Sequence, residues 1–271
     1  MLAERAGGPA AAEPVDSAGC MPRAVLVVPC FNEADRLPIG RFAAFAEASR
    51  EVDFVLVDDG STDATRERLR DLERIDPDRF AVVECGRNRG KAEAVRAGVL
   101  RAFERSPAYV GYWDADLATP LDESSRFVRV LESSPGCEVV FGARVQLLGR
   151  SIHRRPLRHY LGRVFATLAS QSLGLPIYDT QCGAKLFRAT PATRALFSEE
   201  FLTRWLFDVE LVARMIAAGG EDGRTRAHSA IYELPLETWH DVGASKAHAF
   251  DFARAAVDLV RIRWHYGRPA R

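Results

Sequence analysis

Two aspartates separated by one residue, Asp114 and Asp116, carry the strongest chemical signal in the sequence. They follow the apolar run Tyr109–Trp113, which predicts a buried strand. In an extended chain, residues two apart point to the same side, so the two carboxylates are expected to face one way. Such hard oxygen ligands suit Mg²⁺ or Mn²⁺, which could also hold a diphosphate. An isolated Asp-x-Asp pair is also common in solvated turns, and the strand in front of this pair favours the metal site.

Asp58 and Asp59 form a second pair of carboxylates, again after an apolar run, Phe54–Val57. The nearby Ser61 and Asp63 are residue types that cap helices, so an ordinary turn explains part of this segment. It does not explain two adjacent carboxylates at the end of an apolar strand. Because a carboxylate can accept a hydrogen bond from a pyrimidine N3–H or a ribose hydroxyl, the pair predicts a nucleotide site.

Two further segments fit a nucleotide ligand. Residues 29–33 (PCFNE) close the first predicted strand, where backbone groups could frame a base. Residues 86–91 (GRNRGK) form a glycine-bounded basic loop leading into a helix, whose start suits an anion. The loop is not a Walker loop, because Ala92 stands where Ser or Thr is required. No GxGxxG motif follows the first strand, so a dinucleotide-binding fold is disfavoured.

The elements that must position these residues alternate between strands and helices from Pro22 onward. Apolar runs predict strands over residues 24–28, 54–57, 81–83, 109–113 and 139–141, with helical periodicity between them. Repeated strand–helix units imply an α/β fold with a mostly parallel sheet and helices on both faces. Ligands of such sheets bind beyond the carboxyl ends of the strands, where all the polar clusters fall. Trp205, Phe207 and Leu211 are expected to pack in the core rather than to contact a ligand.

Charge and composition exclude several classes of protein. The 37 basic and 37 acidic residues cancel, which argues against general nucleic-acid binding. No run of about 18 apolar residues exists, so no membrane-spanning helix is expected. Five widely spaced cysteines without a CxxC pair fit a reduced, cytosolic compartment.

Positive charge is nevertheless concentrated in one segment. Residues 139–178 contain six arginines and no acidic residue, and residues 246–266 predict an amphipathic helix. Together they predict peripheral, salt-sensitive contact with an anionic membrane surface at the inner face of the membrane. The alternative is that the helix packs on the core and the arginines bind only a diphosphate. Charge reversal at Arg154 and Arg155 is the change that separates the two.

Eight motifs resemble those of a known enzyme family. VVPCFNEADRL, VLVDDGSTDAT, NRGKAEAVRAG and YWDADLATP are similar, in this order, to the motifs of family 2 glycosyltransferases with the GT-A fold. FGARV, DTQCGAKLFR, RWLFDVEL and ETWHDVGASK resemble dolichyl-phosphate β-glucosyltransferases and bacterial polyprenyl-phosphate glycosyltransferases. The resemblance implies a single GT-A domain with a Rossmann-like sheet. It would divide this domain into residues 22–142, the half that binds a nucleotide sugar, and residues 143–271, the acceptor-binding half with the C-terminal amphipathic helix. Residues 1–21 are rich in Ala, Gly and Pro without periodicity, which predicts a disordered leader.

The resemblance also implies roles for individual residues on the donor side. Pro29, Asn32 and Glu33 would frame the nucleoside, Asp59 would bind the uracil, and Lys91 would lie by the base or ribose. Asp114 would contact the ribose or the metal, and Asp116 would ligate the metal.

On the acceptor side, the implied roles concern phosphate and sugar. Arg144 would bind phosphate, Asp179 and Gln181 would line the transferred sugar, and Asp208 and Glu210 would lie near the acceptor. Ser245 and Lys246 would lie in a loop that can close over phosphates. The sequence departs from the family at Ala244, where Gly is usual, and carries Ala118 where many mannosyl relatives carry Gln.

The reaction implied by the resemblance is inverting transfer of a glucose-like sugar from a UDP-sugar to a polyprenyl- or dolichyl-phosphate acceptor, assisted by Mg²⁺ or Mn²⁺. A phosphate monoester has a second pKa of about 6 and is already nucleophilic at neutral pH. A hydroxyl acceptor, such as a soluble sugar, would instead need a carboxylate base, with Asp208 and then Asp179 as candidates. A non-catalytic nucleotide-binding protein is the third alternative, and the intact Asp59 and Asp114/Asp116 set argues against it.

Overall fold

The computed structural model describes residues 23–153, 156–241 and 249–267. The predicted leader, the Ser245–Lys246 loop and the Arg154–Arg155 pair lie outside the described residues. Among the described helices, none has the length and apolar character needed to span a bilayer. The four cysteines of the described chain are all free thiols.

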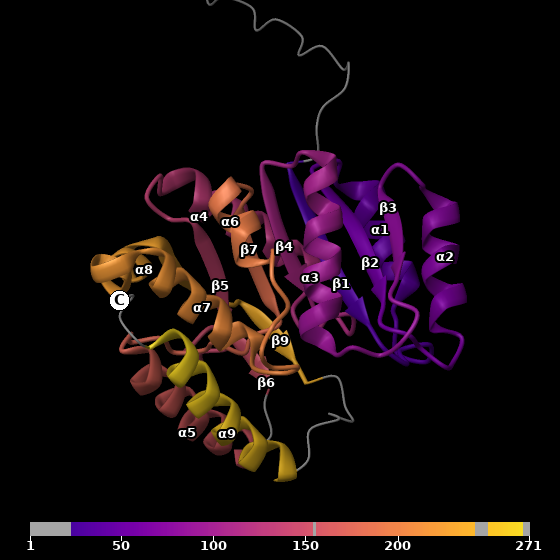
Figure 1. The fold of residues 1–271 in the computed structure, drawn as a ribbon. Helices are drawn as coiled ribbons and strands as arrows, with labels where there is room; N and C mark the ends of the chain where they lie inside the picture. The colour runs from indigo at the N-terminus through magenta and orange to yellow at the C-terminus, as the bar shows by residue number, and fades with distance from the viewer. Residues whose placement is uncertain (1–22, 154–155, 242–248, 268–271) are drawn as a thin grey trace, which may run out of the picture.

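A seven-stranded sheet forms the centre of the protein, in the order β3-β2-β1-β4-β7-β5-β8 (Figure 1). Neighbouring strands pair in parallel, except that β7 runs antiparallel to both β4 and β5. The mostly parallel sheet predicted from the sequence is thus confirmed. The strands are β1 (Ala24–Cys30), β2 (Val52–Asp58), β3 (Phe80–Glu84), β4 (Tyr109–Trp113), β5 (Val139–Ala143), β7 (Ala184–Arg188) and β8 (Ile231–Pro235).

Alternate residues of each buried strand supply two separate apolar cores. In β1, Leu26 and Val28 point into one core, and Val25 and Val27 point into the other. The first core is covered by α1 (Ile39–Ala48), α2 (Thr65–Ile75) and α4 (Ser124–Ser133). The second is covered by α3 (Lys91–Ala102), α5 (Pro156–Leu173), α7 (Phe207–Ala218) and α9 (Ala249–Tyr266). Helices therefore lie on both faces of the sheet, as predicted.

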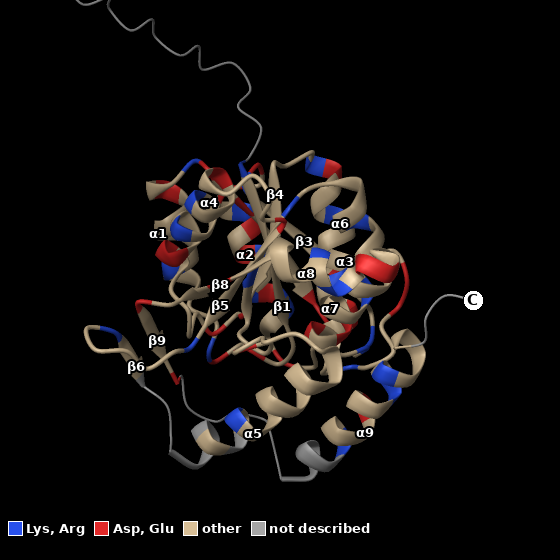
Figure 2. Cartoon of the chain, turned by 90° about the vertical axis from the view of Figure 1, so that its left-hand side faces the viewer, with Lys and Arg blue, Asp and Glu red and all other residues tan. Residues whose placement is uncertain are grey.

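The second half of the chain adds elements that the apolar pattern does not predict. Strands β7 and β8 complete the sheet, and β6 (Ser151–His153) pairs with β9 (Thr238–His240) in a separate ribbon. The short helices α6 (Pro191–Leu196) and α8 (Gly223–Ala230) flank α7 in the chain. Helices α5 and α9 lie side by side beyond the end of the sheet (Figures 1 and 2).

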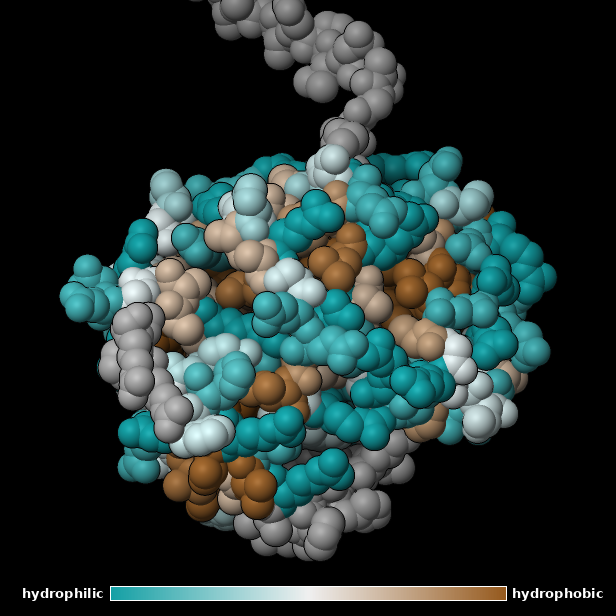
Figure 3. Space-filling view, in the orientation of Figure 1, coloured by the Kyte–Doolittle hydropathy of each residue, from teal (hydrophilic) through white to brown (hydrophobic). Residues whose placement is uncertain are grey.

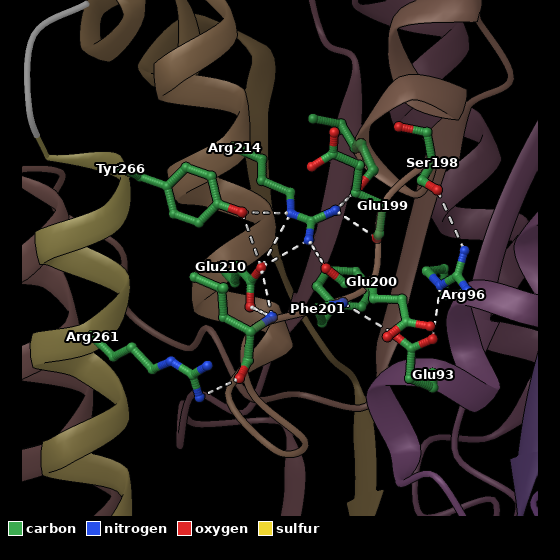
Figure 4. Close-up of polar contacts among 12 residues, drawn as sticks. Glu93, Arg96, Ser198, Glu199, Glu200, Phe201, Glu210, Arg214, Arg261 and Tyr266 are labelled. Atoms are coloured by element: carbon green, nitrogen blue, oxygen red, sulfur yellow. Dashed lines mark hydrogen bonds and ion pairs between the residues drawn. The ribbon is translucent and has the colours of Figure 1, made fainter.

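A buried ion pair fastens α7 to α9 and to the preceding loop (Figure 4). The Glu210 carboxylate is fully buried, and Arg214 Nη2 lies 2.8 Å from its Oε1. Tyr266 of α9 donates its hydroxyl to the same oxygen at 3.1 Å, and the backbone N–H of Leu202 donates to Oε2 at 2.9 Å. The remaining N–H groups of Arg214 reach the carbonyls of residues 196, 199 and 200. Glu210 is thus used inside the fold, away from any surface that a substrate could reach.

Removal of the Glu210 carboxylate should therefore destabilise the protein. In Glu210→Ala the guanidinium of Arg214 stays buried without its counter-charge, which typically costs about 3–5 kcal/mol. Chemical denaturation of the variant and the wild type measures this difference in the free energy of unfolding. Glu199→Ala is the matched control, because the Glu199 side chain is exposed and only its carbonyl contacts Arg214. A Glu210→Ala protein as stable as the control would contradict this account of the cluster.

Candidate functional site

The loops that follow β1 and β2 are joined into one frame at the carboxyl edge of the sheet. The backbone N–H of Asn32 donates to Ser61 Oγ at 3.0 Å, and that of Ala34 donates to Asp63 Oδ2 at 3.2 Å. Asn32 has a left-handed φ of 51° and accepts the N–H of Thr62 through its side chain. Ser61 and Asp63 therefore tie the two loops together, and Asp63 also accepts the N–H of Thr65, the first residue of α2, at 3.0 Å, as expected of a cap-type residue.

Pro29 and Glu33, predicted to frame a nucleoside with Asn32, lie at the same edge. Pro29 is half-buried in β1, next to the buried Cys30. The Glu33 carboxylate forms an ion pair with Arg36 at 2.5 Å, and its backbone N–H donates to Thr65 Oγ1 at 2.7 Å. The frame is therefore held by contacts within the chain.

The two carboxylates after β2 have different tasks. Asp58 is fully buried and accepts the N–H of Ser61 at 3.0 Å, which is the ordinary turn. Asp59 accepts the N–H groups of Arg89 and Gly90, one on each carboxylate oxygen and both at 2.8 Å. Burial raises the pKa of Asp59, and the two N–H groups oppose that rise. Asp59 thereby holds the basic loop 86–90 against the end of β2.

Lys91, the first residue of α3, reaches the Asp114 carboxylate with 2.5 Å between Nζ and Oδ1. Burial lowers the pKa of Lys91, but the charges of Asp114, Asp208 and Asp116 outweigh it, so the net shift is upward. Burial, and then the neighbouring Asp114 charge, raise the pKa of Asp116. The structure thus brings Lys91, Asp114 and Asp116 together with more negative than positive charge.

Asp114 and Asp116 do not continue the strand, so the predicted extended geometry is wrong. The N–H of Leu117 donates to the Asp114 carbonyl at 3.1 Å, and Leu117 has a φ of 50°. A tight turn therefore gathers the two carboxylates, where the pleat of a strand was expected to do so. Asp116 Oδ1 is fixed by the N–H of Ala118 at 3.0 Å.

The same two carboxylates are suitable ligands for Mg²⁺ or Mn²⁺. No group of three or more His, Cys, Asp or Glu side chains that could hold a metal gathers within the described ranges. Mg²⁺ commonly binds through one or two carboxylates and takes its other ligands from phosphate and water. The donor set and its excess negative charge fit such an ion when a diphosphate supplies the remaining oxygens.

On the other side of the edge, Arg144 and Asp179 form a two-pronged ion pair. Arg144 Nε lies 2.7 Å from Asp179 Oδ2, and Nη2 lies 2.8 Å from Oδ1. Burial lowers the pKa of Arg144, but the adjacent Asp179 charge raises it by more. The pair lines a small, partly open pocket whose wall also includes Gly162, Arg163, Phe165, Ala166, Tyr178, Thr180 and Gln181. Of the residues predicted to bind sugar or phosphate in this half, Arg144, Asp179 and Gln181 are thus gathered around one hollow.

Asp208 lies in a buried polar group under the site. Its Oδ1 accepts the Tyr112 hydroxyl in a short hydrogen bond, and Lys185 Nζ lies 2.7 Å from the same oxygen. Sequence reasoning missed Lys185, although a lysine inside the apolar run AKLF was a visible signal. Glu210, two residues further along α7, points into the cluster of Figure 4 and is not brought to the site.

Trp205 does not lie in the core, where it was expected. Its side chain is 54% exposed, whereas Phe207 and Leu211 are fully buried as predicted. The core prediction is wrong for Trp205 because its segment crosses the surface before α7 begins. The carbonyl of the adjacent Arg204 accepts the N–H of Ala92 at 3.3 Å, which places this segment against the start of α3.

Comparison with known proteins agrees with this geometry. The sequence profile described as Glycosyl transferase family 2 matches residues 25–194. A protein of Trichomonas vaginalis named dolichyl-phosphate beta-glucosyltransferase ALG5C is 32% identical, over 89% of this chain and 70% of that protein. The dolichyl-phosphate beta-glucosyltransferase of Saccharomyces cerevisiae is 30% identical, over 89% of this chain and 74% of its own length.

Solved structures show the same fold. Glucosyl-3-phosphoglycerate synthase from Mycobacterium tuberculosis, in complex with Mn²⁺, UDP and glucosyl-3-phosphoglycerate, superimposes with a TM-score of 0.64. The match covers 92% of this chain and 81% of that chain, at 18% sequence identity. The sheet and its flanking helices are therefore of the GT-A type.

The contact between Gly183 and Asp114 provides a test of how the site is held. A Cβ atom at position 183 would lie 1.8 Å from Asp114 Oδ2, and the Asp114 N–H donates to the Gly183 carbonyl at 2.9 Å. Gly183→Ala should lower the free energy of unfolding by about 1–3 kcal/mol, the usual cost of overpacking, and displace the Asp114 carboxylate. Thermal and chemical denaturation measure the loss. Gly136→Ala is the control, because a Cβ there meets open space, and equal stability of the two variants would contradict the contact.

Proposed function

Because the chain belongs to glycosyl transferase family 2, we propose that it transfers a glucose-like sugar from a UDP-sugar to a polyprenyl- or dolichyl-phosphate acceptor. Two observations support the donor: the hydrogen-bonded frame of loops at the ends of β1 and β2, and a solved structure of the same fold in complex with UDP-glucose and Mn²⁺. The names of relatives about 30% identical, including that of Homo sapiens at 31%, support the acceptor.

The acceptor proposal depends on the contacts of the two candidate general bases, Asp208 and Asp179. A general base needs a free lone pair within reach of the hydroxyl that it deprotonates. Both oxygens of Asp179 accept from the fork of Arg144, and Asp208 Oδ1 accepts from Tyr112 and Lys185. Both carboxylates are also buried, so a hydroxyl acceptor would have to reach a buried side chain whose charge is already paired with a cation. A phosphate monoester is ionised at neutral pH and needs no base, so the arrangement favours a phosphate acceptor.

The pocket beside Asp179 is suited to such a phosphate. Two arginines, Arg144 and Arg163, line it against a single lining carboxylate. The Arg163 guanidinium lies 3.7 Å from the centre of the Tyr178 ring and donates to the Tyr178 carbonyl at 2.9 Å. A guanidinium held in this way presents its remaining N–H groups in a fixed orientation, which favours recognition of phosphate oxygens.

On the donor side, Asp114 and Asp116 would hold Mg²⁺ or Mn²⁺. When bound, this ion would neutralise the charge that grows on the departing diphosphate. The Lys91 ammonium lies against Asp114 and would add positive charge at the same place. Asp59 would orient the nucleoside from the end of β2, together with the loop 86–90 that it holds. Gln181, half-buried in the pocket wall, would contact the transferred sugar.

A screen of donors and acceptors with mass spectrometry of the products tests the proposal. UDP-glucose with a polyprenyl phosphate should give product, whereas the matched polyprenol, which lacks the phosphate, should give none. The rate at limiting acceptor should fall as the pH is lowered through about 6, because the acceptor phosphate becomes protonated. Equal turnover of polyprenol or of 3-phosphoglycerate would overturn the acceptor proposal.

The metal site has its own test. Asp116→Asn should lose about tenfold to a hundredfold in turnover, and EDTA should have a similar effect.

We also propose that α5 and α9 rest on an anionic membrane surface. Val257, Val260 and Trp264 of α9 are 67%, 69% and 67% exposed, at a spacing that gives one stripe along the helix. On α5, Tyr160, Val164 and Leu168 form a second exposed stripe. Figure 3 shows apolar side chains gathered at the lower edge of the molecule, where these helices lie.

Charge complementarity points to a bilayer as the occupant of this surface. Leu259 and Ile262 pack α9 on the protein core, so the predicted alternative of a core-packed helix accounts for one of its faces only. Exposed arginines flank the outward stripe at positions 254, 261 and 263, and Figure 2 shows basic residues on both helices. Apolar side chains between arginines are the pattern of helices that lie in the headgroup region of anionic membranes.

Flotation with vesicles that contain phosphatidylglycerol measures this contact. Binding at low salt should weaken as salt is added, and replacement of Val257, Val260 and Trp264 by Ser should reduce it at least tenfold. Arg254→Glu should weaken it several-fold, at about 1 kcal/mol for each basic residue near the surface. Arg68→Glu, on the exposed side of α2, is the matched control and should bind like the wild type. Wild-type protein that stays wholly in the soluble fraction would contradict the proposed membrane surface.

A further inference from the structure

Lys185 is a lysine without exposed surface, in the strand β7 at the middle of the sheet. Its Nζ lies 2.7 Å from Asp208 Oδ1 and donates to the Cys182 carbonyl, also at 2.7 Å. The same ammonium lies 4.7 Å from the centre of the Phe141 ring and 5.3 Å from that of Tyr112. A buried ammonium needs such partners, because its removal from water is costly.

Stability alone is a weak explanation for a charge pair in this place. Buried ion pairs often contribute no more to stability than well-packed apolar residues of similar volume, because both charges lose their hydration. The pair does fix the positions of its neighbours, because the Lys185 ammonium and the Tyr112 hydroxyl both contact the same oxygen of Asp208. The group therefore joins three segments, β4, β7 and α7, at one point.

Two short series of contacts connect Lys185 and Asp208 to Asp114. Lys185 holds the Cys182 carbonyl, and the next residue, Gly183, accepts the Asp114 N–H and lies against its carboxylate. Tyr112 is two residues before Asp114 in β4, and its hydroxyl is held by Asp208. A shift of Lys185 or Asp208 would therefore displace both the 181–183 segment, on the sugar side, and the Asp114 carboxylate, on the diphosphate side.

We propose that Lys185 is a positioning residue, which acts with Asp208 and the Tyr112 hydroxyl to hold Asp114 and residues 181–183 in register for transfer. Asp208 then contributes to turnover through this contact and does not remove a proton from the acceptor. The inference rests on the proposed transfer from a UDP-sugar, because the register concerns its sugar and diphosphate.

Three variants test the unit: Lys185→Met, Asp208→Asn and the double variant. Each single change should lower kcat by roughly a hundredfold, the effect of a small misplacement of reacting groups, and leave the donor KM within about threefold. Because the two residues act as a unit, the double variant should be no slower than the slower single variant. The pH dependence of kcat in Asp208→Asn should keep the shape of the wild-type profile, since no base has been removed.

A second buried ion pair provides the matched control. Arg79 Nε lies 2.7 Å from Asp53 Oδ1 near the start of β2, at the end of the sheet opposite the site. Asp53→Asn should lower the melting temperature and leave kcat unchanged. If Asp53→Asn loses kcat as much as Lys185→Met does, the effect is general destabilisation and the positioning role is wrong. If Lys185→Met keeps wild-type kcat while Asp208→Asn loses it, Asp208 acts alone as a base and the proposal is equally overturned.

Tyr112→Phe keeps the proposal testable if Lys185→Met does not fold. This change removes one hydroxyl, and about 1 kcal/mol of lost orientation would lower kcat roughly fivefold at unchanged donor KM. Unchanged kcat in a folded Tyr112→Phe protein would overturn the inference. All rates are measured with the acceptor that the wild type uses in the screen described above. Failure of the lipid-phosphate proposal would therefore appear in the wild type, whereas failure of this inference would appear only in the variants.

Discussion

A carboxylate buried at the carboxyl edge of this sheet needs a cation or hydrogen-bond donors to replace the water it has lost. The choice of these partners determines most of the arrangement of the site. Asp59 is compensated by two backbone N–H groups, Asp179 by the fork of Arg144, and Asp208 by Lys185 and the Tyr112 hydroxyl. A buried charge without such partners would be too costly to retain. At Asp114 and Asp116, by contrast, two carboxylates share the Lys91 ammonium, and the pKa of Asp116 is raised by burial and by Asp114. Two carboxylates that share one ammonium are the feature on which the proposed site for a divalent cation and a diphosphate rests.

The antiparallel strand β7 connects the two halves of the site. It lies between β4 and β5, so it carries Lys185 into the core beside Tyr112 and brings Gly183 against Asp114. Its preceding segment supplies Asp179 and Gln181 to the pocket that Arg144 lines. One strand therefore connects the Asp114–Asp116 turn to the pocket lined by Arg144 and Asp179, and the ion pair of Asp208 depends on the same strand.

The exposed apolar faces of α5 and α9 are consistent with the proposed acceptor, which carries an apolar tail. Residues of α5 line the pocket on one side and expose an apolar stripe on another, and α9 lies beside α5 with a stripe of its own. A helix that is apolar both toward the core and toward the outside needs a second apolar environment to cover it. The proposed membrane surface would place that environment next to the phosphate pocket.

The sequence by itself determined the parallel strands β1 to β5, the helices between them, and the loops that carry Asp59, Asp114 and Asp116. These are local properties, because apolar runs and cap-type residues act over a few positions. The tertiary structure decided which charges meet. Arg144 and Asp179 are 35 residues apart, and Tyr112 and Asp208 are 96 residues apart, so no local pattern reveals either contact. It also decided that Asp114 and Asp116 lie in a turn, that Glu210 belongs to the core and that Trp205 is exposed. The physical reason is that burial and the pairing of charges depend on strand order and helix packing, which only the complete chain specifies.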